Sequence, residues 1–188
     1  MRLPLYRLVL PLIAVCSTVS AALPNFEADS NDPSDTAQTP APNDPQIVAI
    51  AAAANHVAIE TGALARSQTH NQDLIQLARQ IVIDHQNYTK QTSQLMSRLN
   101  LFPEENEISQ NLIQSGETNL TSLRKLSGNA FDCAFLEQMI SYQKQLLNTL
   151  DNALIPNARN ADLKTFLIQV RFSSADQLQR LELARKKT

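Results

Sequence analysis

Residues 74–99 carry the spacing that most constrains how this chain can fold. Steps of four and three residues alternate along the whole segment, at Leu74, Ala78, Ile81, His85, Tyr88, Thr92, Leu95 and Leu99. A 4-3 repeat of this kind places all of these side chains on one face of a helix and is typical of the seam of a helical bundle. The chain must therefore supply partner helices that cover this face.

Four further segments show helical periodicity, and two prolines separate segments as helix breakers do. We expect helices over about 46–67, 71–100, 106–126, 130–154 and 161–186. Asp44-Pro45 is typical of a helix start, Pro103 and Pro156 fall between segments, and Gly116 weakens the shorter third one. Four long helices, two short loops and a long middle connection holding a short extra helix predict an all-α fold. The specific expectation is a ferritin-like four-helix bundle with a long crossover between its second and third main helices.

The first 45 residues differ in composition from the rest. Residues 1–21 are typical of a signal peptide, with a basic start, a short apolar run and small residues before a cut at Ala22. Residues 22–45 hold five of the nine prolines and five acidic residues without a base, which predicts a disordered acidic linker. We therefore expect the bundle to occupy residues 46–188 of a periplasmic or secreted protein, with no transmembrane segment in the mature chain.

The charge of the chain and its motifs limit the classes of partner and cofactor that it could bind. The chain has 16 Lys and Arg against 18 Asp and Glu with no basic run, so nucleic-acid binding has no electrostatic footprint. Neither a Gly-rich phosphate loop nor a local nucleophile motif is present, so no catalytic or cofactor-binding residues are assigned. An envelope protein is the partner class that this leaves open, and the sequence does not determine the oligomeric state.

Cleavage at Ala22 would remove Cys16 and leave Cys133 as the one cysteine. A single thiol cannot form an internal disulfide, so we expect Cys133 to be a small buried apolar residue. An intermolecular disulfide or a reactive thiol is the alternative.

Three polar residues interrupt the apolar stripes. His85 lies in the middle of its seam, and Gln143 and Gln177 lie on the seams of the last two main segments. Burying such groups costs several kcal/mol when they lack partners. The structural interpretation is a buried polar layer in which these side chains bond to one another and fix the register of the helices.

The alternative interpretation is a metal site. His56 and Glu60 lie one turn apart beside the first stripe, and Asp84 precedes His85, which gives one half-site of metal-ligating residue types. Carboxylate-bridged metal bundles use Glu-x-x-His pairs, and here Val82 stands three residues before His85. A di-iron oxidase is therefore disfavoured. A single transition-metal ion and no cofactor at all both stay open.

At these segments the chain resembles a bacterial family of exported proteins, the domain of unknown function 4142, often labelled predicted outer membrane proteins. The matching stretches are Ile59-Glu60, 62–65, LARQIVIDHQNYTKQTSQL (77–95), LSGNAFDCAFLEQM (126–139) and Asp162-Leu163-Lys164. The resemblance implies a ferritin-like fold and leaves the activity open. By ungapped counting, Gln143 and Gln177 stand where the family usually has histidines, and Gln is a poor ligand for transition metals. The resemblance thus implies that any metal site of the family is lost or changed here.

Two hypotheses on function follow. The first is an exported bundle without enzymatic activity that acts as a binding or envelope-associated structural protein, with outer-membrane association as one form of it. The second is a metal-binding or redox bundle with a degenerate site.

Overall fold

The computed structural model describes residues 40–188, in which every regular element is helical. The long helices are α1 (Asp44–Gln68), α2 (Gln72–Leu99), α3 (Glu107–Leu123), α4 (Gly128–Thr149) and α6 (Ala161–Arg185). A π-helical turn, η1 (Leu150–Leu154), and a short helix, α5 (Ile155–Asn157), continue α4. The expected all-α class is confirmed. The predicted signal peptide 1–21 and most of the predicted linker 22–45 lie outside the described residues.

Asparagine side chains cap four of the helices. Their side-chain oxygens accept hydrogen bonds from backbone N–H groups of the first turn, as Asn43 of α1, Asn71 of α2, Asn106 of α3 and Asn160 of α6. The expected start at Asp44-Pro45 is one residue late, because Asn43 forms the capping box with Gln46. The Asp44 carboxylate instead accepts the backbone N–H groups of Arg159 at 2.8 Å and Asn160 at 3.0 Å, which ties the start of α1 to the start of α6.

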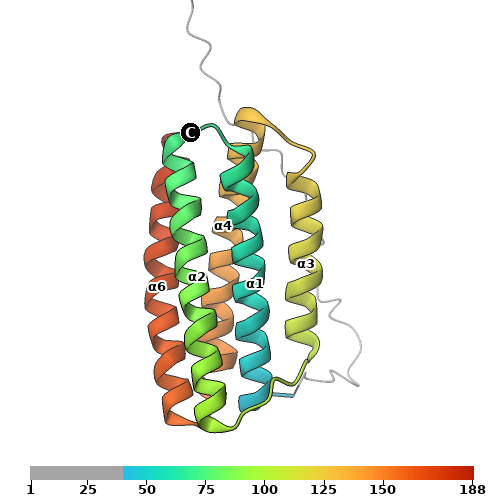
Figure 1. The fold of residues 1–188 in the computed structure, drawn as a ribbon, viewed down its shortest axis with the longest axis vertical. Coiled ribbons are helices and arrows are strands. Elements are labelled where there is room, and N and C mark those ends of the chain that lie inside the picture. Colours follow the sequence, from blue (N-terminus) through green and yellow to red (C-terminus); the bar gives the residue numbers. More distant parts are fainter. Residues whose placement is uncertain (1–39) are drawn as a thin grey trace, which may run out of the picture. The chain divides into compact units, whose positions relative to one another are not determined.

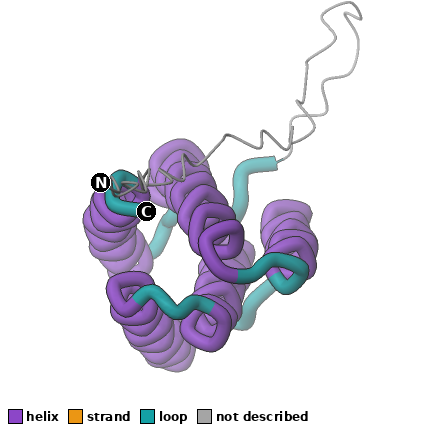
Figure 2. Tube along the Cα trace, turned by 90° about the horizontal axis from the view of Figure 1, so that it is seen from above, coloured by secondary structure: helices purple, strands orange, loops and turns teal. Residues whose placement is uncertain are grey.

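The long helices lie side by side with alternating directions (Figure 1). α1 contacts α2, α3 and α4, while α6 contacts α4 and α2. Seen from the end, α3 stands outside the group formed by the other four (Figure 2). Because α3 carries the chain back along the length of the molecule, α2 and α4 run in the same direction (Figure 1). The result is a helical bundle.

The buried apolar side chains form two clusters, one toward each end of the bundle. The entry cluster lies where α1 begins and comprises Ile47, Val48, Ile50, Ala54, Leu95, Leu146, Leu150, Leu154, Ala158, Leu163, Phe166 and Leu167. The turn cluster lies toward the α1–α2 turn and comprises Ala58, Ala65, Leu74, Ala78, Ile81, Leu123, Phe131, Phe135, Leu136, Met139, Ile140 and Leu181. The 4-3 seam of residues 74–99 contributes to both clusters, as its spacing predicts.

Two helical glycines allow close helix packing. A Cβ atom on Gly62 of α1 would lie 2.9 Å from Val82 Cγ2 and 3.1 Å from the Ala78 carbonyl oxygen on α2. A Cβ atom on Gly116 of α3 would lie 2.6 Å from Val57 Cγ2 on α1. The expectation that Gly116 merely weakens its helix is therefore incomplete, since this residue lets α3 approach α1.

Within the described residues, α1 is long and apolar enough, by length and composition, to cross a membrane. From the sequence we expected no transmembrane segment in the mature chain. In the bundle, 61% of the apolar window of α1 is buried against other helices. Its composition is thus accounted for by its place in the core, where Ala49, Ala53, Ala54 and Ala58 are buried.

Candidate functional site

One polar side chain from each of four helices is buried between the two apolar clusters. These residues are Asn55 of α1, His85 of α2, Gln143 of α4 and Gln177 of α6, which we call the polar layer. Their exposed fractions are 5%, 2%, 0% and 6%. His85, Gln143 and Gln177, the three residues singled out by their seam positions, are all buried and meet in one place.

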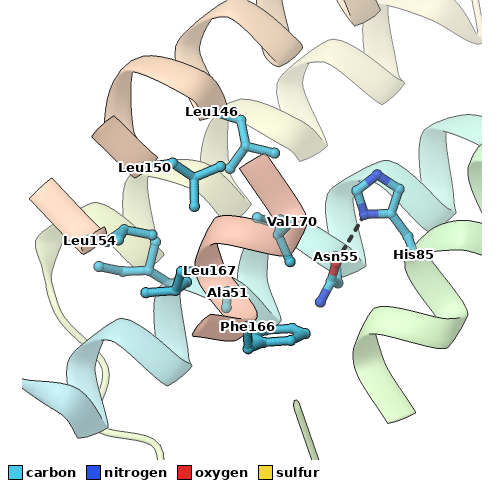
Figure 3. Close-up of a pocket in the computed structure, with 11 residues that line it drawn as sticks. Ala51, Asn55, His85, Leu146, Leu150, Leu154, Phe166, Leu167 and Val170 are labelled. Carbon is cyan, nitrogen blue, oxygen red and sulfur yellow. Dashed lines mark hydrogen bonds between the residues drawn. The ribbon is translucent and has the colours of Figure 1, made fainter. Parts of the chain in front are cut away.

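Hydrogen bonds connect the polar layer across the bundle. His85 Nδ1 lies 2.9 Å from Asn55 Oδ1, the contact drawn in Figure 3. His85 Nε2 lies 3.4 Å from Gln177 Oε1, and the same oxygen accepts a hydrogen bond from Gln143 Nε2. Four helices are thereby linked through side chains alone.

The imidazole of His85 is neutral in the folded protein. Desolvation by burial lowers its pKa from 6.5 to about 4, against smaller opposing effects of Gln177 and Asp84. A neutral ring carries one N–H donor, yet both ring nitrogens face amide oxygens. With Nδ1–H donating to Asn55, Nε2 needs a donor, and the Gln177 amide supplies one when its NH₂ group faces the ring.

A matching rotation of the Gln143 amide satisfies the end of the polar layer. Gln143 Oε1 is buried and has no hydrogen-bond partner among the described residues. If the Gln177 NH₂ group lies between the ring and Gln143, and the Gln143 amide is turned so that Oε1 takes the place of Nε2, then Gln143 Oε1 accepts the second hydrogen of that group. The order Asn55, His85, Gln177, Gln143 then forms a chain in which each contact has one donor and one acceptor.

Aromatic residues enclose the polar layer on its entry-cluster side. The ring of Tyr88 meets His85 edge-on at 5.7 Å between centroids, and Tyr88 in turn meets Phe166 at 6.4 Å. The Tyr142 hydroxyl donates to the carbonyl oxygen of Ala54 at 2.6 Å, and burial raises the pKa of Tyr142. The hydroxyl is therefore protonated at every physiological pH.

The residues of the predicted half-site occupy different environments. His85 is buried, whereas His56 and Glu60 are exposed on α1. Asp84 is half-buried and accepts a hydrogen bond from Gln80 Nε2 at 2.8 Å. Within residues 40–188, no three His, Cys, Asp or Glu side chains are grouped so that they could hold a metal ion. The residue of α1 that meets His85 is Asn55.

Sequence reasoning missed Asn55, although a signal for it exists. Asn55 lies seven residues after Val48 and seven before Gly62, and all three positions are buried. Two adjacent heptad positions of α1 therefore face inward, which makes its buried face wider than the single stripe used for the prediction.

Cys133 differs from its expected state. It is half-buried on α4 and takes part in a disulfide bond. The expectation of a buried apolar residue does not hold for this chain. Removal of residues 1–21 would still leave Cys133 as the single cysteine in the sequence.

The fold and the polar layer together define the class of protein, which is a helical bundle with a buried amide–imidazole layer. Comparison with known protein families identifies the family. The family model described as Domain of unknown function (DUF4142) matches residues 30–182, so the chain belongs to this family. No curated protein and no solved structure matches the chain.

Proposed function

We propose that this chain is an exported, ferritin-like four-helix bundle with a non-enzymatic binding or structural role in the cell envelope. The helix order supports the ferritin-like assignment: two antiparallel pairs, α1 with α2 and α4 with α6, are joined by a crossover that carries α3. Export to the periplasm or beyond rests on the signal-peptide pattern of residues 1–21. Outer-membrane association is the form of envelope attachment that we propose.

The bonding of His85 is the observation that favours a role without chemistry at the polar layer. Both of its ring nitrogens are engaged by amide side chains from α1 and α6. A histidine that acts as a ligand or as a general base needs one nitrogen directed at the metal or the substrate. Here the two nitrogens join helices, and we assign the polar layer to fixing their register.

A metal-binding or redox bundle is the second candidate. The convergence of one polar side chain from each of four helices on His85 favours it, because bundle cofactor sites are built from such facing side chains. In this proposal a single transition-metal ion would engage His85, with His56, Glu60 and Asp84 as the remaining predicted ligands. Either exposed residue would require α1 to rotate before it could reach the core.

Elemental analysis separates the two candidates. The mature protein is purified from the periplasm without chelators or a His-tag, and its metal content is measured by mass spectrometry. We expect no stoichiometric metal, and we expect His85→Gln to lower stability without changing the metal content. Near-stoichiometric iron, manganese, zinc or copper that is lost in His85→Gln and retained in Leu95→Met would overturn the first candidate and establish the second.

A further inference from the structure

A small cavity lies in the entry cluster beside the polar layer (Figure 3). Its walls come from α1, α2, α4, η1 and α6, with His85 and Asn55 at one end and aliphatic side chains together with Phe166 around the rest. The volume open to the centre of a water molecule is about 20 Å³. A single water needs roughly 10–15 Å³ on this measure, so the cavity holds one small molecule.

The π-helical turn shapes the wall of this cavity. Leu150 and Leu154, the first and last residues of η1, both line it. The N–H of Ile155 bonds to the Leu150 carbonyl, five residues back, and the next residue, Pro156, has no N–H to give. The Asn157 side chain donates to the Ala153 carbonyl at 2.8 Å. Local sequence thus maintains the widened turn, a feature that is frequent at functional sites.

The chemistry of the walls disfavours stable hydration. An ordered buried water makes two to four hydrogen bonds, roughly three on average. Among the side chains that line the cavity, only those of Asn55 and His85 carry polar atoms, and the contact between Asn55 Oδ1 and His85 Nδ1 already engages one atom of each. A water molecule here would lose most of its hydrogen bonds, whereas an apolar molecule would lose none.

We propose that this cavity is a binding site for one small, uncharged, apolar molecule, of the size of a diatomic gas. The proposal deepens the binding role proposed above by naming a class of ligand, and it rests on that role only for its biological meaning. Occupation of the cavity itself is a physical property of the fold.

Xenon is the probe, because it is apolar, fits a site of this size and binds without hydrogen bonds. Methyl-labelled protein is titrated with xenon gas and followed by NMR. We expect saturable shifts centred on the methyl groups of Leu150, Leu154, Leu167 and Val170. Ala51 also lines the cavity, and Ala51→Leu should weaken xenon binding at least about tenfold, or ~1.4 kcal/mol.

The matched control is Ala52→Leu, the same change at the exposed neighbouring position, which should leave the xenon affinity unchanged. A second variant keeps the proposal testable if Ala51→Leu does not fold. Leu150→Ala enlarges the cavity and should create saturable binding of benzene, which the parent protein should not bind.

Three results would contradict the cavity proposal. Absence of saturable xenon shifts, or an ordered water bonded to Asn55 in a high-resolution crystal structure, would overturn the proposal. Xenon binding that Ala51→Leu does not weaken would also overturn it. None of these results changes the metal content measured above, so failure of the cavity proposal and failure of the proposed function are distinguishable.

Discussion

On the turn-cluster side of the polar layer, aromatic rings and close backbone contacts fill the core. Phe131 and Phe135 stack with 6.3 Å between ring centroids, and Gly62 brings α1 against α2. On the entry-cluster side, side chains that are mostly aliphatic leave a cavity beside Phe166, and α4 is followed by a π-helical turn. The same seam spacing runs through both halves, so spacing sets which residues face inward and local backbone geometry sets how well they fill the space.

The largest expected effect on stability comes from truncating one buried leucine in each half of the core. Leu136 is 0% exposed in the turn cluster, and Leu150 is 1% exposed beside the cavity. We expect Leu136→Ala to lower the free energy of unfolding by about 4 kcal/mol and Leu150→Ala by roughly 1 kcal/mol less. Leu150 faces empty space on one side and so loses fewer contacts on truncation. Urea unfolding of both variants measures the difference, and equal costs would contradict the contrast between the halves.

The polar layer that separates the halves makes stability depend on pH. In the unfolded chain His85 regains its pKa of 6.5, whereas the folded value is about 4. The unfolded state therefore binds more protons between these values. The contribution of His85 to stability is complete above pH 6.5 and is lost as the pH falls toward 4, by up to roughly 3 kcal/mol.

Replacing the histidine should remove this pH dependence. We expect His85→Gln to flatten the plot of unfolding free energy against pH between 6.5 and 4. His56→Gln, a change at an exposed histidine, should keep the parent slope. If the two variants retain the same slope, the ring of His85 is not held neutral by burial.

Most of the fold was predictable because its helices follow from periodicity. The segments expected over 71–100 and 161–186 match α2 and α6 within one residue at each end. The π-helical turn was not predictable from spacing, since Leu150 and Leu154 fit a regular 4-3 pattern equally well. The turn depends on Pro156, which has no backbone N–H, and on Asn157, whose side chain bonds to the Ala153 carbonyl. Hydrophobic spacing reports neither of these hydrogen-bonding effects.

The polar layer was predictable in part. Seam position alone identified His85, Gln143 and Gln177, because a polar residue in an apolar stripe stands out. The prediction did not include Asn55, because α1 is apolar on most of its surface and a single stripe did not describe its whole buried face. Which predicted residues meet depends on the rotation of each helix, and sequence spacing does not report that rotation between helices.

Enlarging a small residue in each half tests the same contrast from the opposite direction. Ala78 is 0% exposed, and its carbonyl oxygen would lie 3.1 Å from a Cβ on Gly62, whereas Ala51 borders the cavity. We expect Ala78→Leu to cost about 1–3 kcal/mol through overpacking, and Ala51→Leu to be neutral or stabilising. Thermal unfolding followed by circular dichroism gives both values. Destabilisation by Ala51→Leu as large as that by Ala78→Leu would mean that the entry cluster has no usable space.

The smallest expected effect concerns how the entry end is closed. Asp44 is half-buried and accepts two backbone N–H groups at the start of α6, so its carboxylate holds together two helix starts that are distant in sequence. We expect Asp44→Ala to lower the free energy of unfolding by about 1–2 kcal/mol, because both donors lose a protein partner and turn to water.

Asp176→Ala, which removes an exposed ion pair with Arg180 on α6, should cost under about 0.5 kcal/mol. Hydrogen exchange locates the effect: the amides of Arg159 and Asn160 should lose protection in Asp44→Ala, while those of the turn cluster keep it. Uniform loss across both halves would show that the entry end and the turn end unfold as one unit.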